Sequence, residues 1–367
     1  MKQQPKLRVG DIVEVRSKEE ILRTLDKTGQ LGGMPFMPQM FQFCGRRLRV
    51  AKRAHKTCDT INEFKGRRLK DAVHLEGIRC DGQAYGGCEA GCLIFWKVAW
   101  LKRPSDSASP SDRGGNCTEA DVLAGTQRAN GPEGGGPTYV CQATQVLAAT
   151  EPLPWWEPGQ YVEDYTSGNI GLGKLLRGFI YMGYRWFINL GIGLGRPLRW
   201  LYDAFQKLWG GVPYPRRLGK IPQGTPTPTA DLNLQPGDLV RVKSYQTILD
   251  TIDESNRNRG LYFDAEMVPY CGGTHRVLTR VTRIVDEKTG KIREFKNPCI
   301  ILDGAVCQSR YSECRLFCPR SIYAYWREVW LERVPEREAN PDLNAQQRGV
   351  EQSDRAGLDR RGRQNGP

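Results

Sequence analysis

The same pattern of apolar and polar positions occurs twice along this chain. Each copy opens with a short stretch in which apolar residues alternate with polar ones, Ile12–Val15 in the first copy and Leu239–Val242 in the second. A period of two is typical of a strand with one buried face. The sequence therefore predicts a short strand at the start of each copy.

A helix-capping pattern follows the first strand. Ser17 with Glu20 three residues later forms a capping box, which marks the start of a helix, and Gly29 is a residue at which such a helix can end. The second copy ends the same pattern at Asn256. We expect one helix in each copy, with its apolar stripe at Ile21, Leu22 and Leu25 and at Ile248, Leu249 and Ile252.

The second copy continues with a hairpin pattern. Arg276–Ile284 is strand-like, residues 286–291 are turn-forming, and the extended pattern resumes at Ile292 and again at Cys299–Leu302. The later Cys and Trp residues recur at spacings of four, which predicts a helix or a helical turn. We therefore expect a mainly β protein with short helices (α+β), built as tandem duplicated SH3-like small barrels that are joined by a largely helical apolar segment.

The two copies are an internal duplication. Residues 10–80 align without a gap on residues 237–307, at an offset of 227, with 21 identities in 71 columns. Both copies then end in a Trp pair followed by Leu, Trp96 and Trp100 in the first and Trp326 and Trp330 in the second. A single register held this long is the signature of a tandem repeat.

The duplication divides the chain into six parts. Composition sets the other boundaries, because Ser/Gly/Pro-rich and charged segments without large apolar residues do not form a core. We expect a first Cys-rich module (1–103), a disordered linker (104–136), a connecting segment with an apolar helix (137–212), a Pro-rich linker (213–235), a second Cys-rich module (236–334) and a disordered tail (335–367).

Residues 169–210 stand out in the connecting segment. They are mostly apolar, with aromatic residues and with Arg177, Arg185, Arg196 and Arg199 at intervals. A helix that spans a membrane needs about 20 apolar residues, and the central Arg185 makes this stretch a poor candidate. An amphipathic helix at a membrane surface, a helix packed between the two modules, a spanning helix and a partner-binding helix remain open.

Charge adds a second distinction between the two halves. The formal net charge is +13, and residues 1–103 hold 21 Lys and Arg against 11 acids. A basic surface attracts anionic membranes or nucleic acids. The basic run Arg46–Arg53 lacks the interleaved aromatic residues of a nucleic-acid interface, so a solvated strand face is the simpler interpretation. The N-terminus has no apolar export signal, so we expect a cytoplasmic protein. A peripheral position at the inner membrane is compatible with this expectation.

Cysteine is the main candidate chemistry. Eight of the twelve Cys recur at matched positions, and in a reducing compartment clustered Cys more often bind metal than form disulfides. Four thiolates hold a structural zinc ion or, as the alternative, an iron–sulfur cluster. Buried apolar thiols and disulfide or redox pairs are the other two interpretations. The predicted metal ligands are Cys44, Cys80, Cys88 and Cys92 in the first module and Cys271, Cys307, Cys314 and Cys318 in the second.

The first module has three further residues of ligand type. His55, Cys58 and His74 have no counterpart in the second copy, where Thr282, Val285 and Ile301 stand. They extend the predicted metal set, and they make the first module the place to look for chemistry. An ordinary surface or half-buried histidine is the simpler alternative. The chain has no recognisable hydrolase triad, phosphate-binding loop, dinucleotide fingerprint or zinc-protease motif.

Three strings carry a resemblance to a bacterial family of uncharacterised proteins: residues 44–50, 55–60 and 326–331. The resemblance covers nearly the whole chain outside the linker and the tail. Members of that family are often associated with polysaccharide or natural-product gene clusters. The resemblance implies a bacterial accessory protein on the cytosolic side of the membrane, and it transfers no catalytic residue. The Gly-Asp-x-Val opening is also similar to SH3-like barrels such as those of KOW domains and the nitrile hydratase beta chain.

Three functions follow as hypotheses. The first is a non-catalytic, metal-stabilised accessory or interaction protein of a bacterial biosynthetic system, with a protein partner and a contact with an anionic membrane surface. The second is a metal-dependent or redox enzyme with its site in the first module. The third is a nucleic-acid-binding protein that uses the basic first half.

Overall fold

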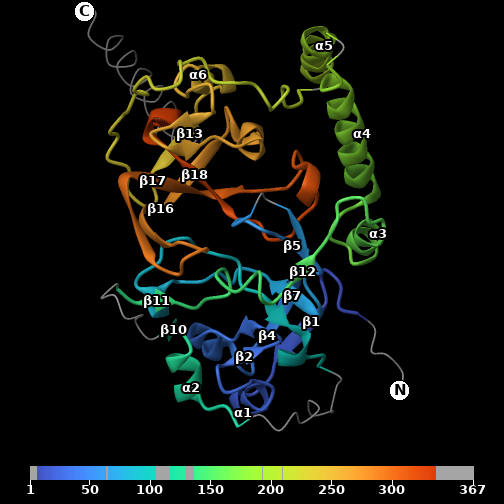
Figure 1. Cartoon of the computed structure of the whole chain (residues 1–367), viewed down its shortest axis with the longest axis vertical. Coiled ribbons are helices and arrows are strands. Elements are labelled where there is room, and N and C mark those ends of the chain that lie inside the picture. Colours follow the sequence, from blue (N-terminus) through green and yellow to red (C-terminus); the bar gives the residue numbers. More distant parts are fainter. Residues whose placement is uncertain are drawn as a thin grey trace, which may run out of the picture.

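The computed structural model describes residues 6–62, 65–104, 116–128, 136–191, 193–208 and 210–335. Helix and strand take up similar shares, 25% and 26%, so the fold is mixed α+β rather than mainly β. Each half contains a five-stranded antiparallel sheet, and Figure 1 shows the first half below the second. The predicted repeat is present as two antiparallel sheet regions of five strands, one in each half. The long helices between the two halves raise the helix content above that expected for a mainly β protein.

The elements of the two halves lie at matched positions. The first half comprises β1 (Ile12–Val15), α1 (Lys18–Leu22), β2 (Gln30–Leu31), β3 (Met34–Pro35), η1 (Pro38–Phe43), β4 (Arg47–Arg53), β5 (Lys56–Cys58), β6 (Gly66–Arg68), β7 (Ala72–Leu75), η2 (Gln83–Tyr85), β8 (Trp96–Lys97), η3 (Val98–Trp100) and β9 (Leu101–Lys102). The second comprises β13 (Leu239–Val242), α6 (Tyr245–Leu249), β14 (Arg257–Asn258), β15 (Leu261–Tyr262), η4 (Ala265–Tyr270), β16 (Thr274–Val285), β17 (Ile292–Val306), η5 (Glu313–Arg315), β18 (Tyr323–Trp326), η6 (Glu328–Trp330) and β19 (Leu331–Arg333). From β1 to η1 and from β13 to η4, every pair of elements differs by the repeat offset.

The predicted helix of each copy is present but short. Ser17 accepts a hydrogen bond from the backbone N–H of Glu20 in a complete capping box, and α1 then ends at Leu22 rather than near Gly29. The carboxylate of Asp26 accepts the backbone N–H groups of Thr28 (2.8 Å) and residue 30 (3.1 Å). This side chain offers the backbone a turn in place of further helix, which is why the helix stops early.

Both sheets have the same strand order, β8-β7-β4-β1-β9 and β18-β17-β16-β13-β19. The two edge strands of each sheet are consecutive in the chain and are joined by a single turn of 3-10 helix, η3 or η6. Of the predicted helix or helical turn around the Trp pairs, only a single 3-10 turn is present, at the second Trp of each pair, and the first Trp lies in an edge strand. No closed barrel is found in the described parts of the chain.

The connecting segment is largely ordered where the structure describes it. It comprises α2 (Glu119–Ala124), β10 (Gln127–Arg128), β11 (Thr138–Tyr139), β12 (Glu151–Pro152), α3 (Gly159–Thr166), α4 (Leu172–Ile188) and α5 (Gly195–Leu208). Residues 116–128 were expected to be disordered, but a capping box of Thr118 and Asp121 starts α2, and Val122 is buried against Gly29. The rest of the predicted linker and tail, residues 105–115, 129–135 and 336–367, lies outside the described residues.

A long hairpin in each half reaches the other half. We call residues 55–69 and 282–298 the outer hairpins, and residues 80–92 and 307–318 the Cys loops. In the second half β16 and β17 run without interruption into the outer hairpin, whereas in the first half β4 breaks after Arg53 and the outer hairpin pairs with β12 instead. Backbone N–H of Arg283 donates to Glu89 at 3.1 Å, and Lys56 donates to the carbonyl of Leu316 at 2.8 Å. Each outer hairpin therefore packs on the Cys loop of the opposite half.

Helices α4 and α5 form an arm along one side of the molecule (Figure 1). One face of α4 packs on the second half, where Gly178 lies against the ring of Phe317 and the rings of Tyr181 and Tyr311 are 4.9 Å apart. The opposite face of α4 is exposed. The expected packing against the modules is therefore present on one face of this helix only.

Candidate functional site

The structure does not assemble the predicted metal sites. All twelve cysteines and all three histidines lie in the described residues. Across residues 6–335, apart from the short gaps given above, no group of three or more His, Cys, Asp or Glu side chains converges as a metal ion would require. Neither four-cysteine set is therefore brought together as a ligand set.

In the first set, the thiols contact protein groups instead. Cys44 ends η1, where its thiol lies near Lys18. The backbone N–H of Cys80 donates to the carbonyl of Cys92 at 2.8 Å, and the Sγ of Cys88 accepts the backbone N–H of Val285 at 3.2 Å. Cys88 and Cys92 were expected on one face of a helical turn, but the chain between them is not helical.

In the second set, Cys307 and Cys318 are close enough to interact electrostatically, but the four thiols do not converge as ligands of one ion. Cys271 ends η4, and burial raises the pKa of its thiol to about 12. Cys307 lies 3.4 Å from the hydroxyl of Ser309, and burial raises its pKa to about 12 as well. Cys314 is part of η5, whereas Cys318 is buried beside a cysteine of the other half. The thiols at matched positions therefore have unlike surroundings.

The partner of Cys318 is Cys58. The two thiols are close enough to interact, although they lie 260 residues apart in the sequence and in opposite halves. The thiol of Cys318, together with the nearby guanidinium of Arg320, lowers the pKa of Cys58 to about 6. Arg320 also donates to the carbonyl of Cys58 at 3.2 Å and pairs with Glu287 at 2.8 Å.

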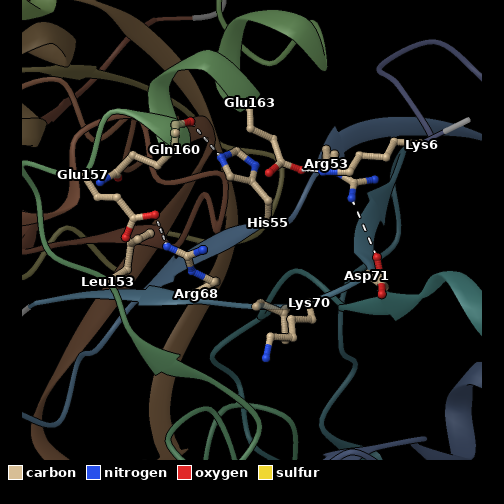
Figure 2. Close-up of a pocket in the computed structure, with 12 residues that line it drawn as sticks. Lys6, Arg53, His55, Arg68, Lys70, Asp71, Leu153, Glu157, Gln160 and Glu163 are labelled. Carbon is tan, nitrogen blue, oxygen red and sulfur yellow. Dashed lines mark hydrogen bonds and ion pairs between the residues drawn. The ribbon is translucent and has the colours of Figure 1, made fainter.

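His55 lines a cavity of about 310 Å³ between the first half and α3. Figure 2 shows ion pairs at its wall: Arg53 reaches Glu163 at 2.6 Å and Asp71 at 3.9 Å, and Arg68 contacts Glu157. The imidazole Nε2 of His55 lies 3.2 Å from the carbonyl of Gln160. Its Nδ1 is buried and has no hydrogen-bond partner among the described residues.

A buried charged pair lies behind His55. The Nζ of Lys56 is 2.6 Å from one carboxylate oxygen of Asp164, and the other oxygen is 3.4 Å from the Nε2 of His55. Burial raises the pKa of Asp164 to about 6 and lowers the pKa of His55 to about 4. At neutral pH the cluster therefore holds a neutral imidazole next to an ion pair, so the Nδ1 of His55 can accept a hydrogen bond.

His74 packs in the core of the first half. It is fully buried, its Nδ1 is 2.8 Å from the carbonyl of Ile94, and its ring lies 4.7 Å from the ring of Phe95. Burial lowers the pKa of His74 to about 3. The structure therefore separates the three additional ligand-type residues: His55 faces a cavity, Cys58 meets Cys318, and His74 packs in the core.

The basic run of β4 is neutralised by neighbouring acids. Arg47 lies 3.5 Å from Glu14, and Arg49 lies 3.7 Å from Glu76. These exposed pairs agree with a solvated strand face, and the structure adds no observation for nucleic-acid binding there.

The largest exposed apolar surface lies on the arm. Twelve large apolar side chains of residues 172–208 are exposed, among them Trp200 at 71% and Leu208 at 82%. The other ten are Leu172, Leu176, Phe179, Ile180, Trp186, Phe187, Leu190, Leu194, Leu201 and Phe205. Asp203 is the one acid of residues 170–220, and it contacts Arg217 on the body side of α5. We name these twelve side chains the arm face.

Sequence reasoning missed three residues of these sites. Lys56 and Asp164 form an ion pair 108 residues apart, and Arg320 reaches Cys58 across 262 residues. No local pattern marks these residues, because each is a single charged side chain in an unremarkable stretch. Only their burial, which a charged side chain tolerates when it is paired, identifies them.

Within the described residues, no helix has both the length and the apolar character needed to cross a bilayer. A scan against protein-family models finds no match to this chain, and a search of curated proteins finds no similar sequence. The resemblance to a bacterial family therefore stays a prediction, and the geometry alone carries the functional argument.

Proposed function

We propose that this protein is a non-catalytic accessory protein that attaches to an anionic membrane surface through the arm face. The observation that carries the proposal is the exposure of twelve large apolar side chains on two adjacent helices. A soluble monomer rarely exposes a continuous apolar surface unless it serves for binding. The two Cys-rich modules then form the body that the arm holds at the membrane.

The distribution of side chains on the arm supports a lipid surface as the occupant. On α4, the exposed positions Leu172, Leu176, Ile180 and Phe187 recur at helical spacing, while Gly178 and Tyr181 face the body. Exposed Trp, Phe and Leu on one face with Lys and Arg on its flanks are typical of helices that lie in the plane of a membrane interface. The arm is thus built to lie on a bilayer without crossing it.

Charge favours an anionic bilayer. Residues 172–208 contain six bases against the single acid Asp203. Four of the bases are exposed, Lys174, Arg177, Arg196 and Lys207, whereas Arg185 and Arg199 are only partly exposed. Each base near an anionic surface contributes about 1 kcal/mol to binding at low salt. A membrane with anionic lipid therefore complements the positive charge of the arm. A protein surface without acidic residues would not.

The modules themselves are proposed to be SH3-like. Their strand order, the long insertion after the first strand and the 3-10 turn between the last two strands are those of a small five-stranded barrel that has not closed by hydrogen bonds. Modules of this kind commonly present their loops to other proteins, which supports the expected protein partner. Zinc or an iron–sulfur cluster has no converging ligand set in the described residues to support it.

Vesicle co-sedimentation tests the membrane proposal. We expect the full chain to bind vesicles of phosphatidylglycerol with phosphatidylcholine, and to bind pure phosphatidylcholine much less. The double variant Leu176→Glu/Leu201→Glu should lose most of the binding. The matched control Leu123→Glu/Leu218→Glu changes two equally exposed leucines outside the arm and should keep it.

Two outcomes would overturn the proposal. One is binding that the arm variant leaves unchanged. The other is concentration-dependent self-association in sedimentation that the arm variant abolishes, with no vesicle binding by the parent chain. That second outcome would assign the arm face to a second copy of this chain.

One observation favours a second candidate, a small-molecule site in the first module. His55 lines the cavity with a buried nitrogen that has no partner among the described residues. The function would be an enzyme or a ligand-binding protein that uses His55 as an acceptor. A compound that raises the melting temperature of the parent chain, but not that of His55→Phe, would support this candidate.

A further inference from the structure

Cys58 and Cys318 are brought together by the reciprocal packing of the two halves. Cys58 ends β5 in the first outer hairpin, and Cys318 ends the Cys loop of the second half. Only 3% and 4% of their surfaces are exposed. Two contacts bracket the pair: Lys56 donates to the carbonyl of Leu316 at 2.8 Å, and Arg320 donates to the carbonyl of Cys58 at 3.2 Å. No element of either half alone could place these two sulfur atoms next to one another.

We propose that Cys58 and Cys318 form a reversible disulfide that links the two halves covalently. The oxidant is a low-molecular-weight disulfide. The thiolate of Cys58 attacks one sulfur of that disulfide, forms a mixed disulfide and releases one small thiol. Cys318 then attacks the Cys58 sulfur, closes the protein disulfide and releases the second small thiol. The two protein thiols are oxidised, one small disulfide is reduced to two thiols, and the two protons leave with those thiols.

The surroundings fit an exchange-competent pair better than two inert core thiols. Arg320 donates to the carbonyl of Cys58, and its guanidinium lies 4.0 Å from the Cys58 Sγ. A guanidinium next to a thiol stabilises the thiolate, which is the attacking species. Arg320 is held in turn by Glu287, so the cation stays beside the sulfur.

The repeat supplies an internal comparison. Cys318 matches Cys92, but the position that matches Cys58 is Val285. Val285 is part of the second outer hairpin and packs on the other Cys loop, where its backbone N–H donates to the Sγ of Cys88 at 3.2 Å. The two halves therefore pack reciprocally, yet only one of the two equivalent contacts carries the second thiol. We therefore expect one disulfide per chain, at one of the two equivalent contacts between the halves.

The burial of the pair sets how it reacts. A small disulfide reaches the sulfur atoms when the outer hairpin opens, so oxidation is expected to be slow and to speed up in dilute urea. Once formed, the bond closes a loop between residues 58 and 318, which restricts the unfolded chain and stabilises the folded one. The oxidised protein should unfold at a higher urea concentration than the reduced protein.

A cleavage assay tests the proposal on the full chain. A site for a specific protease is inserted after Gly224, in an exposed stretch between the halves. The protein is equilibrated with oxidised and reduced glutathione, alkylated, denatured and cut. Fragments that stay together without reductant and separate with it contain the link. We expect linked fragments from the parent chain, none from Cys58→Ser or Cys318→Ser, and unchanged linkage in the control Cys299→Ser.

Peptide mass spectrometry of the parent chain keeps the test decisive even if a variant fails to fold. A Cys58–Cys318 peptide supports the proposal. Separate fragments at every glutathione ratio, including in dilute urea, would overturn it. So would a link that maps to other cysteines.

Discussion

The hydroxyl of Thr60 donates a hydrogen bond to the carboxylate of Glu287, and these two residues hold the same position in the two repeats. Equivalent positions contact one another when two copies pack around a twofold axis, as in an isologous interface. The contacts between each outer hairpin and the opposite Cys loop agree with this arrangement. The two halves of the chain therefore pair as the subunits of a dimer do.

Glu89 is expected to hold one side of this pairing. Its carboxylate accepts the backbone N–H of Arg283 at 3.1 Å and the hydroxyl of Thr282 at 3.1 Å. Glu89→Ala leaves these donors unpaired, which should cost about 1–3 kcal/mol of unfolding free energy in urea denaturation. The control Glu294→Ala removes an exposed acid that lies 3.8 Å from the same Arg283 and should cost under about 0.5 kcal/mol. Equal effects of the two variants would contradict the reciprocal interface.

The buried pair of Lys56 and Asp164 should behave as a unit. Either Lys56→Met or Asp164→Leu leaves an isolated buried charge and should lower the unfolding free energy by about 3–5 kcal/mol. The double variant removes both charges and should recover much of that loss. A double-mutant cycle measures the coupling, and the exposed pair Lys70–Glu151 serves as the reference with little coupling. Additive losses at Lys56 and Asp164 would contradict this prediction.

His74 should contribute to acid sensitivity. Its pKa is about 3 in the folded protein, against 6.5 for an ordinary histidine, so between these values the unfolded chain binds a proton that the folded chain does not. Stability therefore falls as pH falls through this window, by up to about 1.4 kcal/mol per pH unit for this one proton.

Urea denaturation at several pH values measures the effect. The variant His74→Gln should show a shallower loss of stability between pH 6 and pH 4 than the parent chain, by about one proton. An NMR titration of the parent chain, in which the His74 ring stays neutral at pH 5, is the direct check. A ring that protonates near pH 6 would show that the prediction is wrong.

Thr24 and Thr251 should be energetically equivalent. Each hydroxyl accepts the indole N–H of a buried tryptophan, from Trp100 at 3.2 Å and from Trp330 at 2.9 Å. Thr24→Val and Thr251→Val keep the shape of the side chain but leave the indole N–H without an acceptor. Each substitution should therefore lower the unfolding free energy by about 1–3 kcal/mol. Thermal unfolding of the two variants compares them. A large loss at one site with none at the other would show that the repeats do not share this anchor.

Local chemistry explains why parts of the fold could be predicted. The strand at Ile12–Val15 and the cap at Ser17 are confirmed because alternation and capping act over a few residues. The predicted length of α1 was wrong because the Asp26 side chain competes for the backbone. Near Trp96 the prediction of a helix or a helical turn is met only by a single 3-10 turn, because a spacing of four also fits a strand followed by such a turn. The same residue spacing is compatible with a helix and with a strand followed by a 3-10 turn, and tertiary packing determines which of the two forms.

The sequence by itself determined the duplication, the apolar arm and the retention of eight cysteines, because these are properties of order and composition. The tertiary structure alone decided which thiols meet. Cys318 lies next to the unmatched Cys58 and away from Cys271, because the outer hairpin of one half crosses to the Cys loop of the other. Contacts between residues hundreds of positions apart depend on how the halves pack, and no local pattern encodes that packing.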